Sequence, residues 1–129
     1  MSIQHGEQNL TVGYVSVAQS ATDRRVGHLS YWLGTGFQGR GYMTEAVRHA
    51  IAAGFRYLKL ETIEAGAHPA NVNSFAVMRR VGMSPIGERL VWITRSHQNE
   101  RCLFYSLTRA EFQALLDDNS DWSFIDESV

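Results

Sequence analysis

Two kinds of hydrophobic pattern alternate along this chain. Short runs rich in β-branched and aromatic residues predict strands, and apolar residues that recur every three or four positions predict helices. The predicted strands are residues 10–17, 26–33, 60–65, 90–94 and 102–107, and residues 3–5 fit either a short strand or a frayed end. The predicted helices are residues 44–58, 74–81 and 108–116. A strand, a helix and a strand in succession over residues 26–65 imply a parallel crossover.

Residues at the helix ends support these assignments. Glu45 lies in the first turn of the first predicted helix, where a negative charge suits the helix dipole. Gly82 follows the second helix as a plausible C-terminal cap. Thr108 and Glu111 have the spacing of a capping box and predict the start of the last helix.

Composition and charge narrow the class of protein. With 129 residues and 44% apolar content, we expect one domain, residues 1–129, with an acidic tail at 117–129. A net charge of −1 gives no electrostatic reason to expect nucleic acid or a membrane as partner. The five histidines have no metal-site spacing and Cys102 is the single cysteine, so we expect no metal. Without a signal or membrane-spanning run, the expected location is cytoplasmic.

A glycine-rich turn, residues 38–43, lies between a predicted strand and a predicted helix. Gly39 and Gly41 free the backbone there, so several N–H groups at the helix start can point at one phosphate. The alternative is an ordinary tight turn. A nucleotide P-loop is excluded because no Gly-Lys-Ser/Thr follows, and Thr44 occupies the place of the third glycine in a dinucleotide fingerprint.

The spacing of this turn resembles a known motif. Gln38 and Gly41 fit Gln/Arg-x-x-Gly-x-Gly/Ala, which is motif A of the GNAT superfamily of acetyl-CoA-dependent N-acetyltransferases, whereas Met43 departs at the last position. Residues 41–46, Gly-Tyr-Met-Thr-Glu-Ala, resemble the RimJ/RimL branch, which acetylates protein N-termini. The resemblance extends from about residue 10 to residue 116.

A second match lies downstream. Asn71 and Ser74 precede a short helix that ends at Gly82-Met83, and this is similar to the GNAT motif B region, Asn-x-x-Ser followed by a helix that closes in Gly-Phe. Met83 replaces the usual Phe with another large apolar residue. Two matches on the expected elements are more specific than either alone.

The resemblance implies an α+β GNAT fold, in which two central parallel strands, here residues 28–33 and 60–65, splay apart. It also implies that acetyl-CoA is the co-substrate, with its pantetheine arm in that opening and its pyrophosphate on the glycine turn. The cofactor-binding residues implied in this way are Tyr31, Trp32, Leu33, Gln38, Gly39, Arg40, Gly41, Tyr42, Met43, Thr44, Asn71 and Ser74.

The catalytic groups are less clear from the sequence. In many GNAT enzymes, a tyrosine four residues before the Gly-Phe pair acts as the general acid, but Met78 occupies that position here. Ser74 is the candidate acid, with a helix-start role as the alternative. Glu64 is a candidate general base or a solvent-facing carboxylate. Tyr105 is a second candidate acid or a packed strand residue.

The resemblance predicts transfer of an acetyl group to a primary amine, which we expect to be a protein or peptide N-terminus. The alternatives are a non-catalytic acyl-CoA-binding or interaction module and an acetyltransferase of small amines. Family members usually carry a further strand and two helices before the region of Ile3. This sequence has no room for them, so we expect an exposed sheet edge and exposed apolar helix surface. Because another subunit tends to cover such surfaces, we expect a homodimer.

Overall fold

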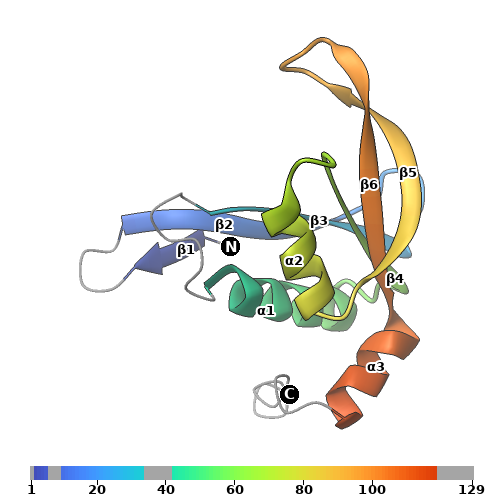
Figure 1. Cartoon of the computed structure of the whole chain (residues 1–129). Helices are drawn as coiled ribbons and strands as arrows, with labels where there is room; N and C mark the ends of the chain where they lie inside the picture. The colour runs from blue at the N-terminus through green and yellow to red at the C-terminus, as the bar shows by residue number, and fades with distance from the viewer. Residues whose placement is uncertain (1, 6–9, 34–41, 119–129) are drawn as a thin grey trace.

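The computed structural model describes residues 2–5, 10–33 and 42–118. Its strands form a six-stranded sheet in the order β1-β2-β3-β4-β6-β5 (Figure 1). The strands are β1 Ser2–His5, β2 Leu10–Gln19, β3 Val26–Leu33, β4 Thr62–Ala67, β5 Ser84–Ile93 and β6 Gln98–Thr108. The helices are α1 Tyr42–Tyr57, α2 Val72–Arg80 and α3 Arg109–Asp118. The sequence therefore predicted every element except β1, which it left open between a short strand and a frayed end, and β3 has the predicted bounds.

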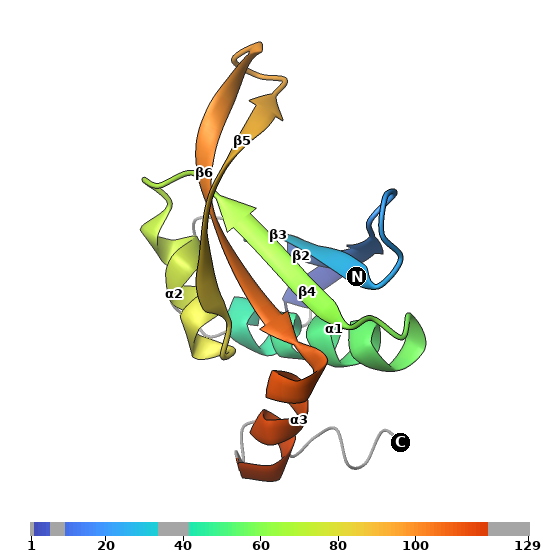
Figure 2. The ribbon, with the colours of Figure 1, turned by 90° about the vertical axis from the view of Figure 1, so that its right-hand side faces the viewer.

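The helices gather on one face of the sheet. Helix α1 packs on β2 and β3, and α2 packs on β4 and on α1 (Figures 1 and 2). Apolar residues fill this layer, and those with almost no exposed surface are Val15, Val47, Ile51, Phe55, Leu60, Ile63, Met78, Val81 and Leu107. Helix α3 joins the same layer through Phe112, whose ring stacks on Phe55 at a centroid distance of 4.7 Å. Within the described ranges, no helix covers the opposite side of the sheet, which we call the open face.

The two central strands are parallel and pair over a short length. The register joins Val26 to Thr62, Gly27 to Ile63 and His28 to Glu64. Beyond His28, β3 continues to Leu33 paired with β2 on one side, while β4 continues beside β6. In Figure 1 the first strands run across the view and β5 and β6 run nearly upright. The sheet is thus forked, and the fork leaves one backbone edge of β3 without a strand partner in the described residues.

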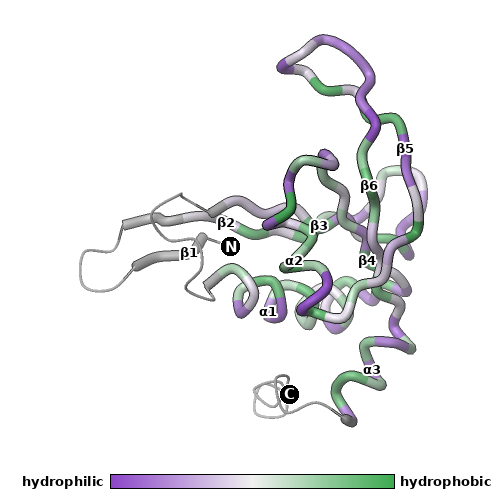
Figure 3. The backbone as a smooth tube through the Cα atoms, in the orientation of Figure 1, coloured by the Kyte–Doolittle hydropathy of each residue, from purple (hydrophilic) through white to green (hydrophobic). Residues whose placement is uncertain are grey.

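Strand β5 is much longer than its pattern predicted. It begins at Ser84, six residues before the predicted start at residue 90. Pro85 and Gly87 are poor strand formers, and the register shift between them marks an irregularity that accommodates both. Pairing with β6 therefore outweighs local propensity. The tip of this hairpin is hydrophilic in Figure 3.

The predicted end-of-helix features are confirmed, although α1 and α2 each begin two residues before the predicted start. Gly82 follows α2 with φ of +93°, a conformation that favours glycine. At α3, the Thr108 N–H donates to Glu111 Oε1 at 2.9 Å and the Glu111 N–H donates to Thr108 Oγ1 at 3.2 Å, which is the reciprocal capping box. None of the helices in the described ranges has the length and apolar character needed to cross a lipid bilayer.

Candidate functional site

The start of α2 lies beside the fork, on the helix-covered face. Asn71 is the N-cap of this helix, and its side-chain oxygen accepts a hydrogen bond from the Ser74 N–H at 3.2 Å. The cap satisfies one of the N–H groups that a helix start leaves unpaired. Asn71 thus has a structural role that fixes the backbone of Ser74, one of the candidate acids.

Ser74 is joined to β3 through Tyr31. The Tyr31 hydroxyl donates to the Ser74 carbonyl oxygen at 2.8 Å, and the two side-chain oxygens are 2.7 Å apart, close enough for a second hydrogen bond. Burial raises the pKa of the Tyr31 phenol, and the hydrogen bond with Ser74 acts in the opposite sense. The sequence nominated Tyr31 only for its position on the strand. Its position two residues after buried Leu29 indicates that its side chain lies on the same, helix-covered face, but does not indicate its partner.

An open pocket of about 380 Å³ lies on the other side of the fork. His28 and Ser30 are exposed and alternate with buried Leu29 on β3, so they belong to the open face. The polar side chains that line the pocket are His28, Ser30, Glu64, His68 and Glu100. Its apolar wall includes Val91, Ile93, Cys102 and Phe104 from the β5–β6 hairpin.

Glu64 lies in this pocket, opposite His28 at the last paired position before β3 and β4 separate. It forms an ion pair with Arg89. The two guanidinium nitrogens donate to its two carboxylate oxygens at 2.9 and 3.2 Å, and this raises the pKa of Arg89. Arg89 also lies over the ring of Phe104, 4.8 Å from its centroid. Sequence reasoning missed Arg89 because it lies in the unpredicted half of β5.

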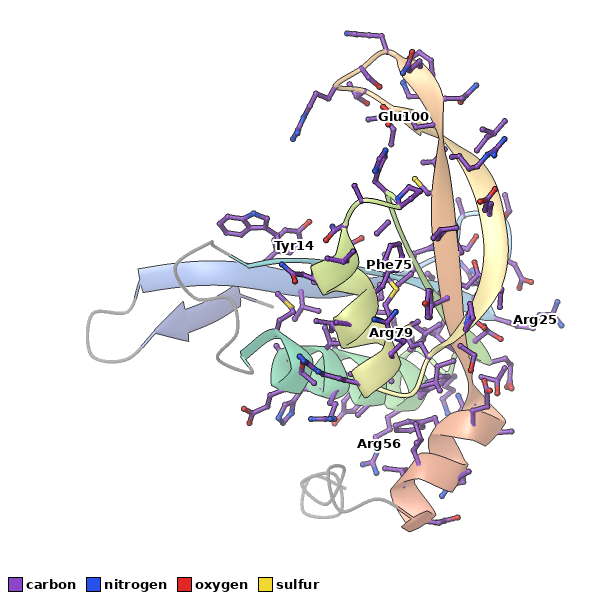
Figure 4. All side chains as sticks on the ribbon, viewed as in Figure 1. Tyr14, Arg25, Arg56, Phe75, Arg79 and Glu100 are labelled. Atoms are coloured by element: carbon purple, nitrogen blue, oxygen red, sulfur yellow. The ribbon has the colours of Figure 1, made fainter. Side chains whose placement is uncertain are left out.

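A second polar pair, His68 and Glu100, links the segment that precedes α2 to the β5–β6 hairpin. His68 Nδ1 accepts a hydrogen bond from the Ala70 N–H at 3.1 Å, and its Nε2 lies 3.7 Å from Glu100 Oε1. The Ser96 hydroxyl also donates to Glu100. Figure 4 shows that Glu100 belongs to the outer part of the hairpin, away from α2. Within the described residues, His28 is left without a side-chain hydrogen bond or ion pair.

The remaining candidates are divided between the core and the surface. Tyr105 is buried, stacks on Phe75 at 5.6 Å and accepts a hydrogen bond from Arg79 at 3.4 Å. Met43 and Thr44 are buried in the first turn of α1, and Trp32 is exposed. Leu33 and Tyr42 are described by their backbone alone. Gln38, Gly39, Arg40 and Gly41, with the rest of the predicted phosphate turn, lie outside the described residues.

Relatives with curated names are similar to part of this chain. YjcK and YdaF from Bacillus subtilis are both assigned by inference as N-acetyltransferases, YdaF as a ribosomal one. YjcK is 41% identical over 59 residues, covering 46% of this chain and 33% of YjcK. YdaF is 27% identical over 101 residues, covering 78% of this chain and 55% of YdaF. The chain thus spans between about a third and just over half of the length of these relatives.

Solved structures share the fold. A ribosomal-protein-S5-alanine acetyltransferase from Vibrio fischeri has a TM-score of 0.75 at 24% identity, covering 86% of this chain and 61% of that one. RimJ from Mycobacterium smegmatis, in complex with CoA-disulfide, has a TM-score of 0.74 at 21% identity, covering 94% of this chain and 56% of RimJ. A variant of spermidine N-acetyltransferase SpeG from Vibrio cholerae has a TM-score of 0.70 at 15% identity, covering 86% of this chain and 65% of SpeG.

The family itself follows from the sequence. The model of the acetyltransferase (GNAT) domain matches residues 1–84, which is more than half of the chain. The matched region contains the forked strands β3 and β4, the glycine turn and α2. The forked α+β sheet is the predicted GNAT fold, and the chain belongs to the GNAT acetyltransferase family.

Proposed function

We propose that this chain transfers the acetyl group of acetyl-CoA to a primary amine. The observation that carries the proposal is the fork between β3 and β4, because it opens onto both faces of the sheet. The capped start of α2 lies on one face and the open-face pocket lies on the other. A donor that enters from the helix side can therefore meet an acceptor that enters from the open face.

The backbone edge of β3 fits the donor. Between Leu29 and Leu33, the side of β3 that faces the fork has no strand partner among the described residues. The amide groups of a pantetheine arm can pair with such an edge as a neighbouring strand would. The same edge carries the N–H groups that we assign to the oxyanion which develops on the carbonyl oxygen.

The reaction needs no covalent enzyme intermediate. Acetyl-CoA supplies a thioester whose C–S bond breaks as the neutral amine nitrogen forms the C–N bond. The proton lost by the amine passes to water or to a pocket base, for which His28 and Glu64 are the candidates on the open face. Because Glu64 is already paired with Arg89, we assign it to orienting the amine or a water molecule.

We infer that the acceptor is a peptide N-terminus. Both carboxylates of the pocket already have partners. Glu64 is paired with Arg89, and Glu100 is close to His68 and accepts a hydrogen bond from Ser96. A polyamine would favour unpaired carboxylates, whereas one terminal amine with a small side chain suits an apolar wall flanked by paired charges. The name of YdaF, assigned by inference as a ribosomal N-acetyltransferase, agrees with this choice.

The test is release of coenzyme A from acetyl-CoA in the presence of an amine. We expect release with a peptide that begins with alanine, slower release with spermidine, and none with the same peptide already acetylated at its N-terminus. Faster turnover of spermidine would overturn the acceptor assignment. Thermal stabilisation by acetyl-CoA without release to any amine would support the non-catalytic binding module instead.

A further inference from the structure

We propose that Tyr31 is a positioning residue, which holds Ser74 so that its hydroxyl can donate a hydrogen bond to the sulfur of coenzyme A in the fork. The inference rests on the proposed function, because it needs coenzyme A to bind there. It deepens that function by making Tyr31 and Ser74 one unit instead of treating Ser74 as an isolated acid.

The backbone of Ser74 is held at two points. Its N–H donates to Asn71 at 3.2 Å, and its carbonyl oxygen accepts from Tyr31 at 2.8 Å. The partner from β3 is 43 positions away in sequence, so this contact fixes the start of α2 relative to the free edge of β3. What remains free to turn is the Ser74 hydroxyl.

The hydrogen atoms of the pair can be counted. Tyr31 has one hydroxyl hydrogen, and it is used in the bond to the Ser74 carbonyl. The 2.7 Å contact between the side-chain oxygens must then use the hydrogen of Ser74. When a sulfur anion lies nearby, the Ser74 hydrogen can turn toward it, and the bond from Tyr31 to the carbonyl stays intact.

Relative acidity determines what this hydrogen can do. An ordinary thiol has a pKa of about 8.5 and an ordinary phenol about 10, and burial raises the pKa of Tyr31 further. A thiolate is therefore too weak a base to remove a proton from the pair. The pair stabilises the leaving thiolate by a charge-assisted hydrogen bond, and water protonates the sulfur later.

The inference predicts that bound coenzyme A is favoured as its thiolate. Calorimetry compares coenzyme A with dethio-coenzyme A, which lacks the thiol, from about pH 7 to about pH 9.5. A site that prefers the thiolate lowers the thiol pKa on binding, so the affinity for coenzyme A relative to the dethio ligand rises with pH. We expect a rise of about tenfold, the size of one hydrogen bond to a charged group.

Three variants and a matched control make the test specific. Ser74→Ala should flatten the pH dependence, and Ser74→Thr, which keeps the hydroxyl, should retain it. Tyr31→Phe should reduce it to about threefold or less, as expected when a positioning contact worth roughly one neutral hydrogen bond is lost. Tyr57→Phe is the matched control, since this tyrosine is exposed at the end of α1. It should behave as the wild type.

The outcomes separate the inference from the proposed function. A wild-type protein that binds neither ligand would overturn the proposed function, and the inference with it. Binding of both ligands with a flat ratio, or a full rise in Tyr31→Phe, would overturn the inference alone. Because Tyr31→Phe removes one oxygen atom only, a folded variant is expected, and its thermal transition checks this directly.

Discussion

Arg89 on β5 holds both carboxylate oxygens of Glu64 on β4, although these two strands are not neighbours in the sheet. The guanidinium crosses β6, which lies between them, and passes over the ring of Phe104. The charge at the inner end of the open-face pocket is therefore set by a residue 25 positions away from the carboxylate.

Replacing Arg89 should change the preference among amines. Arg89→Met leaves the Glu64 carboxylate unpaired, so polycations gain an attraction of roughly 1 kcal/mol in this partly solvated pocket. We expect the KM for spermidine to fall about fivefold relative to that for the alanine peptide. Arg101→Met is the control, because Arg101 pairs with Glu88 at 3.3 Å and does not line the pocket. Equal effects of the two variants would contradict the assignment.

Gly66 keeps the pocket wall in place. A Cβ atom added at Gly66 would lie 2.6 Å from the Phe104 ring, so Gly66→Ala must push the ring aside, into space that it now only lines. Such overpacking costs about 1–3 kcal/mol of folding stability. We also expect the displaced ring to raise the KM for the amine, while the affinity for acetyl-CoA is preserved. The double variant Gly66→Ala with Phe104→Leu should recover most of the loss. Failure to recover would mean that the ring does not transmit the effect.

Asn71 should contribute to stability before it contributes to chemistry. Loss of its cap in Asn71→Ala should cost about 1 kcal/mol. For a domain of this size, that lowers the thermal midpoint by roughly 4 °C. Asn71→Asp can still cap the helix and serves as the control. A midpoint in Asn71→Ala that equals the wild-type value would show that α2 does not depend on this hydrogen bond.

The glycine turn remains a prediction from the sequence. If Gly41 allows backbone N–H groups to approach the pyrophosphate, Gly41→Asp should abolish binding of acetyl-CoA, because it adds bulk and a like charge. Gly39→Ala should weaken binding less. Thermal stabilisation by acetyl-CoA measures both. Full stabilisation of Gly41→Asp would remove the turn from the site.

The predicted homodimer now has a candidate surface. Strand β5 is an edge of the sheet, and Leu90 and Trp92 expose 69% and 57% of their surface on one side of it. Replacing both residues with serine should convert a dimer into a particle of 14.5 kDa, measured by light scattering. Tyr57→Ser, at an exposed aromatic residue of α1, is the control. A wild-type protein of monomeric mass at micromolar concentration would contradict the prediction.

Local signals predicted the framework and missed its cross-connections. β3 was predicted with its observed bounds because a glycine-containing break follows a continuous β-favouring run. The capping box at Thr108 was equally local. β5 was predicted at less than its full length, because Pro85 and Gly87 hide a strand that depends on its partner. Propensity does not report such pairing.

The candidate site shows the same division. Motif spacing placed Asn71 and Ser74 at the start of a helix, where the structure has them. It gave no sign that Tyr31 reaches Ser74 or that Arg89 reaches Glu64, since these contacts depend on how the sheet folds. The interactions that tune chemistry are therefore the ones least visible in the sequence.

Because β3 and β4 pair at three positions only, amide hydrogen exchange along β3 should alternate between slow and fast residues. Alternate amides of an antiparallel strand point to opposite sides. Those between Leu29 and Leu33 that bond to β2 are therefore protected, while their immediate neighbours face the fork with no strand partner among the described residues. Deuterium should therefore enter this strand at every second residue, in the middle of the sheet. A ligand that pairs along that edge would slow the fast amides, and the alternation would disappear.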